Sequence, residues 1–231
     1  MSDKGMLYFE RMMSKVHLSG KKVLIVFAAM TLSFSGMAQE GWTLSKDKDG
    51  IKVYTRATDE SPFDEFRATM VLNQSVHSLI AVLQDIENMP EWAYNVKSAS
   101  ILKELGDTVQ FYYTEVSIPF PFTNRDAVYK GSYYWKNDSS LLVVDIQMLP
   151  NYIEPKEDLV RIPFGKGFWR VKVLDDKRLD VTFQMVVDPG GSVPAWMANM
   201  FVNETPIYTF TKLREMIVKE KYQQQQFDFV K

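Results

Sequence analysis

The chain has no cysteine and only two histidines in 231 residues. Without cysteine it can form neither disulfides nor thiolate metal sites, and no lipid anchor can be attached through a cysteine. His17 lies in a predicted leader, and His77 lies early in a predicted helix, where we expect an ordinary surface residue. The sequence also lacks a nucleophile elbow, a phosphate-binding glycine loop and a metal-binding histidine pattern. Hydrolases and metalloenzymes are therefore disfavoured, and we expect no cofactor, no metal and no catalytic residues.

The first 38 residues are predicted to be a secretory signal peptide. Two lysines precede an apolar run over residues 23–32, and small residues at 36–38 suit cleavage before Gln39. The apolar run is short for a bilayer span, so an uncleaved membrane anchor is the less favoured alternative. The leader is unusually long, and a translation start about a dozen residues after Met1 is a further alternative. We expect a protein that is exported to the periplasm or secreted, and export without cysteine favours a bacterial envelope.

The remainder of the chain is weakly acidic. The leader holds five of the 27 Lys/Arg residues and two of the 29 Asp/Glu residues, which leaves 22 basic and 27 acidic residues. This balance disfavours nucleic acid as a partner and disfavours strong attraction to anionic membranes. No linker or repeat divides the chain after the leader, which is long enough for one domain with a sizeable core. We predict a monomeric domain over residues 39–222 and a polar C-terminal tail over residues 223–231, in which the glutamine run at 223–226 is expected to be a solvated or frayed end.

Alternation of apolar and polar residues predicts a series of strands separated by short polar turns. The predicted strands are residues 51–57, 63–73, 98–103, 108–118, 126–137, 140–149, 167–174 and 178–187, with hairpin turns at 137–140 and 175–177. After the second strand, apolar residues at helical spacing follow Ser75, which can cap a helix. Pro90 ends that helix or starts a short second one that bears Trp92. Many sequential strands with a helix near each end indicate an antiparallel α+β domain.

Residues 188–199 are the most informative segment, because they connect a strand directly to a long closing helix. Their Pro-Gly-Gly run ends a strand, Ser192 can cap a helix, and Pro194 suits the first turn. Pro206 is expected to kink or break the helix, because it removes a hydrogen bond and crowds the preceding turn. Apolar residues three and four positions apart predict one face packed on a sheet: Trp196, Met197, Met200, Phe201, Ile207, Phe210, Leu213 and Ile217.

Alternation also assigns one face of each strand to the interior. The expected inner residues are Phe66, Ala68, Met70 and Leu72; Phe111, Tyr113 and Glu115; Ala127, Tyr129, Gly131, Tyr133 and Trp135; Leu142, Val144, Ile146 and Met148; Trp169, Val171 and Val173; and Leu179, Val181, Phe183, Met185 and Val187. A surface this apolar either packs into a solid core or holds an apolar guest. From the pattern alone the solid core is the more common outcome.

Several motifs occur in a recognisable order: Trp42, the runs at residues 50–56 and 91–92, the Pro-Phe-Pro-Phe-Thr-Asn-Arg-Asp run that opens residues 119–129, and the closing helix. With this order, over about residues 40–222, the chain resembles the START family, the steroidogenic acute regulatory protein-related lipid transfer domains. The resemblance implies the α+β helix-grip fold shared with Bet v 1-like proteins. In that fold a curved antiparallel sheet wraps around the long C-terminal helix and leaves a lipid-sized tunnel between them.

The resemblance further implies a carrier that binds a hydrophobic, lipid-like ligand in this tunnel, with the cell envelope as its expected place of work. The expected partners are a lipid or another hydrophobic small molecule and, transiently, a membrane. Family members usually begin with a helix before the first strand, whereas only a few residues separate the predicted cleavage site from Trp42. One end of the tunnel is therefore either open or closed by something else.

Residue roles are carried over from the same resemblance. The family places an arginine of this motif inside the tunnel, which makes Arg125 a candidate for contact with a lipid head group. We expect Glu115 to pair with it and Asp126 to point away, although Arg125 and Glu115 could equally form a purely structural pair. The predicted ligand-binding residues are Arg125, Glu115, Tyr113, Tyr129, Tyr133, Trp169, Phe183, Met185, Met200 and Phe210. The predicted lid and gate residues are Pro119, Phe120, Pro121, Phe122, Trp196 and Pro206.

Two other functions remain open at the level of sequence. An enzyme of the polyketide cyclase or aromatase kind could use Glu115, Arg125 and Tyr113 to position a polyphenolic substrate. A binding or scaffolding module with a vestigial, filled cavity is the other alternative. Apolar walls accept many kinds of lipid, so the sequence does not name the ligand.

Overall fold

The computed structural model describes residues 41–136, 140–191 and 193–230. The chain from Gly41 onward forms one compact unit. The predicted signal peptide, most of the predicted turn at 137–140 and the capping role of Ser192 lie outside the described residues.

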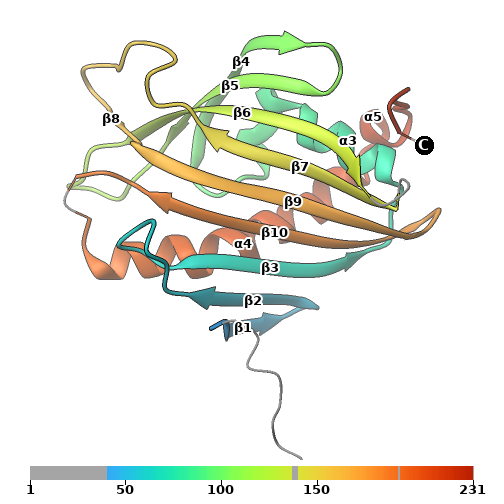
Figure 1. Ribbon diagram of the computed structural model, residues 1–231, viewed down its shortest axis with the longest axis horizontal. Coiled ribbons are helices and arrows are strands. Elements are labelled where there is room, and N and C mark those ends of the chain that lie inside the picture. Colours follow the sequence, from blue (N-terminus) through green and yellow to red (C-terminus); the bar gives the residue numbers. More distant parts are fainter. Residues whose placement is uncertain (1–40, 137–139, 192, 231) are drawn as a thin grey trace, which may run out of the picture. The chain divides into compact units, whose positions relative to one another are not determined.

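Ten strands form one sheet, in which neighbouring strands are antiparallel except for β8, which pairs with β6 in parallel (Figure 1). The spatial order is β1-β2-β3-β10-β9-β7-β6-β5-β4. The bounds are β1 (Thr43–Lys48), β2 (Ile51–Arg56), β3 (Glu65–Leu72), β4 (Val96–Leu105), β5 (Val109–Val116), β6 (Arg125–Lys136), β7 (Leu141–Met148), β8 (Val160–Arg161), β9 (Phe164–Asp175) and β10 (Arg178–Asp188). The eight predicted strands are all present, with ends shifted by a few residues.

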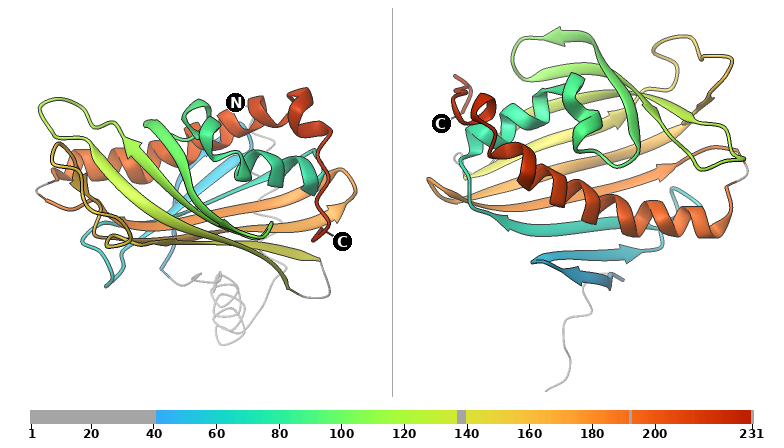
Figure 2. Two further views of the ribbon diagram at one scale, coloured as in Figure 1. Left: turned by 90° about the horizontal axis from the view of Figure 1, so that it is seen from above. Right: turned by 180° about the vertical axis from the view of Figure 1, so that it is seen from behind.

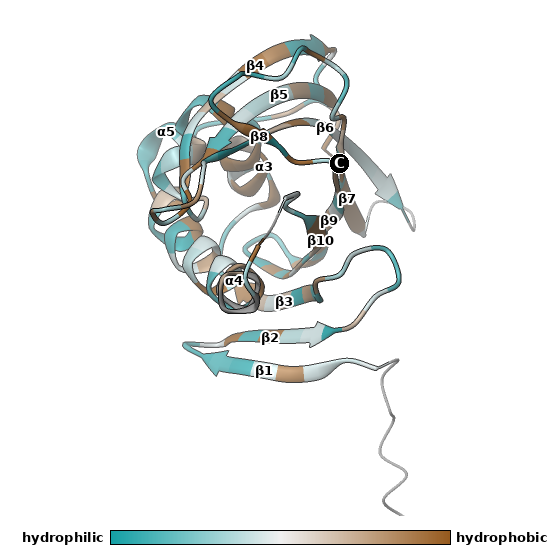
Figure 3. Cartoon of the chain, turned by 90° about the vertical axis from the view of Figure 1, so that its left-hand side faces the viewer, coloured by the Kyte–Doolittle hydropathy of each residue, from teal (hydrophilic) through white to brown (hydrophobic). Residues whose placement is uncertain are grey.

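Two strands were not predicted from the sequence, β1 and β8. β1 is an edge strand whose residues are almost all exposed, so no buried face imposes alternation on it. Figure 3 shows its polar second half in teal. β8 has only two residues, which is too short for any periodic pattern.

The helices lie on the concave face of the sheet, and the end-on view of Figure 3 shows the sheet curving around α3 and α4. Their bounds are α3 (Val76–Gln84), the 3-10 helix η2 (Ile86–Glu91), α4 (Ala195–Ile217) and α5 (Glu220–Gln223). Ser75 caps α3 as predicted, because its side chain accepts a hydrogen bond from the backbone N–H of Ser78. The architecture is the expected helix-grip α+β fold.

α4 runs through Pro206 as one helix (Figure 2), so of the expected kink or break the break is wrong, and a kink stays a prediction. The apolar side of the helix beyond Pro206 is buried: Ile207 is 9% exposed, and Phe210 and Leu213 are fully buried. Packing of this side on the sheet and α3 compensates for the one hydrogen bond that proline cannot make.

The C-terminal tail also differs from the prediction. The glutamine run at 223–226 is exposed as predicted, but Phe227, Phe229 and Val230 pack against the main core, so the tail is not polar and solvated throughout. His77 is half-buried and accepts a hydrogen bond from the backbone N–H of Phe227 at 3.1 Å. The expectation of an ordinary surface histidine is therefore wrong as well.

Candidate functional site

A cavity of about 210 Å³ lies between the sheet and α4. Side chains from η2, β5, β6, β7, β9, β10 and α4 line it. A cavity of about 150 Å³ in an engineered protein is large enough to bind benzene, so this hollow exceeds an ordinary packing defect. The interior is thus not a solid core.

The predicted site residues divide into those that the structure brings to the cavity and those that it does not. Six of them line the cavity, from strands β6, β9 and β10: Arg125, Tyr129, Tyr133, Trp169, Phe183 and Met185. The side chains of Met200 and Trp196 lie outside the described residues. Whether any of these residues touches a ligand stays a prediction.

The wall formed by β9 and β10 is aromatic. The rings of Trp169 and Phe183 stack with centroids 4.2 Å apart, and Trp92 meets Trp169 edge-on at 6.5 Å. Phe210 was expected to touch the ligand, but it is fully buried behind this wall, with its ring 5.6 Å from that of Trp169. It supports the lining and does not belong to it. Trp92, from the end of η2, belongs to the lining.

The inner face of β5 is the opposite of the predicted one. Tyr112 and Thr114 line the cavity, because they lie opposite the inward residues Tyr129 and Ala127 of β6. Tyr113 lies under the ammonium group of Lys156, 4.2 Å from its ring centroid, on the other side of the sheet. The assignment of Tyr113 to the ligand is therefore wrong.

Glu115 lies on the same outer side as Tyr113. Its carboxylate pairs with Lys97 at 2.7 Å and accepts a hydrogen bond from Asn124 at 3.3 Å. The hydrogen bond from Lys97 lowers the pKa of Glu115, so the carboxylate is ionised. Its partners hold it on the outer side of the sheet. Glu115 is neither a cavity residue nor the partner of Arg125, and both predictions for it are wrong. Asp126 does turn away from the cavity, and pairs with Arg161 at 2.9 Å.

A group of tyrosines supplies the polar part of the cavity wall. The rings of Tyr112 and Tyr129 stack with centroids 4.9 Å apart, and Tyr133 lies four residues further along β6 on the same face. Burial raises the pKa of Tyr129 to about 12 and also raises the pKa values of Tyr112 and Tyr133. These phenols therefore stay neutral near pH 7 and can act as hydrogen-bond donors.

Arg125 lies at the start of β6 and lines one end of the cavity, with only 4% of its surface exposed. Its side chain donates hydrogen bonds to the carbonyl oxygens of Thr123, of Pro189 at 3.4 Å and of Gly190 at 3.2 Å. Within the described part of the chain, no carboxylate pairs with it. Burial lowers its pKa, and two of its five N–H donors remain after these three bonds. The site has an uncompensated positive charge.

The turn between β10 and α4 presents the two carbonyls that hold Arg125. The backbone N–H of Gly190 donates to the carboxylate of Asp188 at 2.9 Å, which stabilises the turn. Gly190 and Gly191 both adopt positive φ, at 69° and 64°, a region that favours glycine. The Pro-Gly-Gly run thus does more than end a strand, because its shape places carbonyl oxygens around the guanidinium.

The predicted gate loop connects β5 to β6 at the same end of the cavity. Ile118 lines the cavity, but Pro119, Phe120, Pro121 and Phe122 do not. Phe120 is 95% exposed and Pro119 and Pro121 are exposed too, whereas Phe122 is half-buried. The loop therefore presents apolar groups to solvent beside Arg125. Whether the loop gates the cavity stays a prediction.

Several lining residues were missed at the level of sequence. They are Met89 and Tyr94 from the segment around η2, Tyr112 and Thr114 from β5, and Thr205 and Thr209 from α4. Thr205 and Thr209 are four residues apart and so share one helix face, a spacing that could have been used.

Among the described residues, no cluster of three His, Asp or Glu side chains could hold a metal ion. The same part of the chain has no helix both long and apolar enough to span a membrane.

Comparison with known proteins agrees with this geometry. A START domain family model matches residues 26–220. The crystal structure of a STAR-related lipid transfer protein from Xanthomonas axonopodis is similar, with 38% sequence identity and a TM-score of 0.71, over 78% of this chain and all of that one. An uncharacterised protein from Pseudomonas aeruginosa is 29% identical over 85% of this chain and 96% of its own length. The phosphatidylcholine transfer protein of Rattus norvegicus is 28% identical over 68% of this chain and 75% of its own length. The chain belongs to the START domain family.

Proposed function

We propose that the protein binds a lipid with an anionic head group in its cavity and carries it across an aqueous space. The observation that carries this proposal is the buried Arg125, which lines one end of a mostly apolar cavity and is held there by backbone carbonyls alone within the described residues. Similarity to lipid transfer proteins, one of them at 38% identity, supports lipid as the ligand.

The energetics favour an amphiphile over a purely apolar guest. An acyl chain of about a dozen methylenes gains about 10 kcal/mol when it leaves water, at about 0.8 kcal/mol for each CH₂. That gain retains the chain but does not orient it. Burial of a guanidinium without an anion is unfavourable, because the charge loses its hydration. A carboxylate or phosphate at this place offsets that free energy through charge-assisted hydrogen bonds. The head group is therefore expected at Arg125, with the chain along the aromatic wall.

The same residues argue for a carrier and not an enzyme. General acid–base catalysis works best with a group whose pKa lies near the operating pH, whereas the pKa of Tyr129 is about 12. His77 hydrogen-bonds to the C-terminal tail and does not line the cavity. Glu115, which the cyclase alternative needed, faces away. Binding and release are what the remaining cavity groups can do.

The predicted leader supports a proposal for the cellular location, and the gate loop supports one for membrane contact. The basic and apolar pattern of residues 21–38 supports export into the cell envelope. The almost fully exposed Phe120 supports a brief contact with a membrane surface, since an aromatic side chain gains free energy when it enters the bilayer interface. A carrier needs such a contact at the end where the head group lies.

The test is to offer delipidated protein the total lipid extract of a bacterial envelope and to analyse the recovered protein by native mass spectrometry. We expect one acidic lipid bound for each protein. Recovery of only neutral lipids would refute the role of Arg125, and reproducibly empty protein would refute the carrier function. Heat-denatured protein taken through the same procedure measures nonspecific carry-through.

A further inference from the structure

The C-terminal tail has an unexpected position in the fold. After α5 the last described residues, 224–230, run from α3 toward the sheet (Figure 2, left). Three of them, Phe227, Phe229 and Val230, are half-buried against the main core, whereas Gln224, the residues at 225–226 and Asp228 are exposed. Apolar side chains on either side of the exposed Asp228 suit a tail that lies along a protein surface. A solvated terminus would not bury such side chains.

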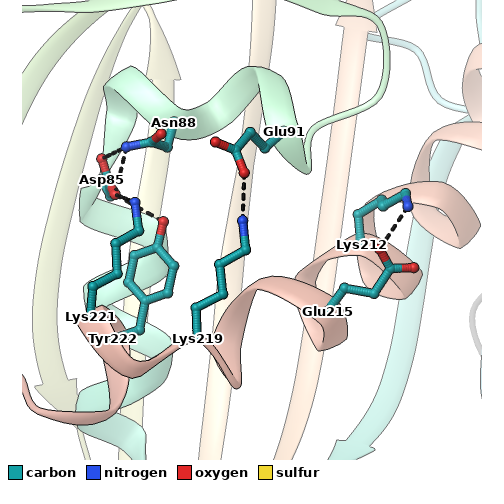
Figure 4. A network of polar contacts seen from close by, with 8 residues as sticks. All are labelled: Asp85, Asn88, Glu91, Lys212, Glu215, Lys219, Lys221 and Tyr222. Carbon is teal, nitrogen blue, oxygen red and sulfur yellow. Dashed lines mark hydrogen bonds and ion pairs between the residues drawn. The ribbon is translucent and has the colours of Figure 1, made fainter.

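α5 fastens the base of this tail to α3 and η2 (Figure 4). The carboxylate of Asp85, at the end of α3, accepts hydrogen bonds from Tyr222 at 2.9 Å and from Lys221 at 3.0 Å. Lys219 pairs with Glu91 at 2.6 Å. Tyr222 is buried, so this anchor has a hydrophobic part as well as exposed ion pairs, which alone contribute little.

The first contact of the tail itself is with α3. The ring of Phe227 stacks on the imidazole of His77, with centroids 6.3 Å apart and planes within 10°. The backbone N–H of Phe227 donates to Nδ1 of His77, so the bond requires an unprotonated Nδ1. One side of the tail is therefore held by α3.

The second contact is with β6, on the other wall of the cavity. The indole N–H of Trp135 donates to the carbonyl oxygen of Phe229 at 2.9 Å. The ring of Phe229 meets the ring of Tyr133 edge-on at 6.2 Å, and Tyr133 lines the cavity. The tail thus bridges α3 and β6 directly behind a cavity residue.

This bridge lies at the end of the cavity remote from Arg125. Arg125 and Tyr133 are eight positions apart on the same strand, which corresponds to about 26 Å at about 3.3 Å per residue.

We propose that residues 224–230 form a strap that closes the cavity at the end opposite Arg125, and that its release opens a second route to the cavity. Beyond α5, three half-buried apolar side chains and two hydrogen bonds hold the strap to α3 and the sheet, few enough contacts for reversible opening while the sheet and α4 stay folded. The inference concerns access to the cavity and holds for any ligand.

The test uses the absence of cysteine, which makes a single introduced thiol a clean reporter of access. Val144→Cys places the thiol on β7 opposite Tyr133, near the strap, and Val187→Cys places a matched thiol at the Arg125 end of β10. Both valines line the cavity, and valine and cysteine are similar in size. The rate of reaction with a small maleimide is measured for each, with and without Phe227→Ala and Phe229→Ala together.

We expect loss of the two rings to raise the reaction rate at position 144 about ten-fold and to leave the rate at position 187 within two-fold. Hydrogen exchange of residues 224–230 in the same samples should show the strap released. Equal acceleration at both positions would mean general loosening and would overturn the proposal, as would an unchanged rate at position 144. If the double variant does not fold, Trp135→Phe removes the N–H that donates to the Phe229 carbonyl while keeping an aromatic ring, and it should raise the rate at position 144 about three-fold. Gln226→Ala, on the exposed side of the strap, is the control.

Discussion

Replacing Arg125 by methionine tests the role of the buried charge most directly. Methionine keeps an unbranched apolar side chain in the same space but removes all five N–H donors. Loss of a hydrogen bond to a charged group costs about 1.5–3 kcal/mol, and every 1.4 kcal/mol is ten-fold in affinity. We therefore expect the affinity for an anionic lipid to fall about 10- to 100-fold.

The assay compares two probes that differ only in charge, palmitate and its methyl ester, by displacement of a fluorescent fatty acid. The Arg125→Met variant should lose affinity for palmitate by the full factor and keep affinity for the ester within about three-fold. Arg125→Lys should fall between, because an ammonium group retains the charge but cannot hold the fork of bonds to Pro189 and Gly190. Equal losses for both probes would mean that Arg125 only supports the turn, and unchanged palmitate affinity would refute the reasoning altogether.

Fold stability has to be measured beside the affinity, because Arg125 also holds three carbonyls. Its removal leaves these acceptors without a partner, which destabilises the fold, but it also removes the cost of a buried, uncompensated charge. The two effects oppose each other, so we expect the free energy of unfolding in urea to change by less than about 2 kcal/mol. A larger loss would assign Arg125 to the fold first and to the ligand second.

Three further predictions test the gate loop, the cavity and the strap. Phe120→Ala should slow lipid transfer between vesicles about ten-fold and leave lipid affinity and thermal stability unchanged, because the ring is 95% exposed and contributes only when it enters a membrane; a normal transfer rate would contradict this. Gly131→Leu should abolish lipid binding without loss of stability, because a Cβ there meets nothing closer than 3.6 Å and the side chain fills the hollow; undiminished binding would place the ligand elsewhere. Burial lowers the pKa of His77, so its contribution to strap docking is complete above its ordinary pKa of 6.5 and is lost as the pH falls toward the lowered value. Hydrogen exchange of the strap, corrected for intrinsic rates, should rise between pH 7.5 and 5 in the wild type and stay flat in His77→Gln; a flat wild-type profile, or favourable attraction of His77⁺ to Asp228 that protects the strap at low pH, would refute it.

Most of the sheet could be predicted from the sequence, because long strands with one buried face must alternate. On β10, Leu179, Val181 and Phe183 alternate with polar neighbours, and all three are buried. The edge strand β1 has no such constraint and was missed. Pro206 shows that a local rule can also predict too much. Its missing N–H and its ring predict a kink or break of the helix, and burial of the residues after it outweighs the tendency to break.

The face of β5 could not be predicted, because both of its faces are covered. Tyr112 packs inward on Tyr129, while Phe111 stacks at 5.0 Å on Tyr152 of the loop after β7. Aromatic residues therefore occur at consecutive positions and alternation gives no direction. Only the register with β6 decides the face, and register is a property of the folded sheet. The error over Tyr113 and Glu115 follows from this.

The strap could not be predicted either, since its first three residues, 224–226, are all glutamine while its contacts depend on only a few apolar side chains. Its position nevertheless bears on how a carrier with one charged end would work. An apolar chain that enters past Arg125 into a cavity closed at the far end must compress or expel whatever occupies that end, which opposes uptake. A strap held by a few reversible contacts beside Tyr133 provides an outlet for the displaced contents without unfolding of α4. If both proposals hold, the two ends have different tasks, recognition of the head group at Arg125 and relief of the cavity at the strap, and substitutions at the two ends should change affinity and uptake rate independently.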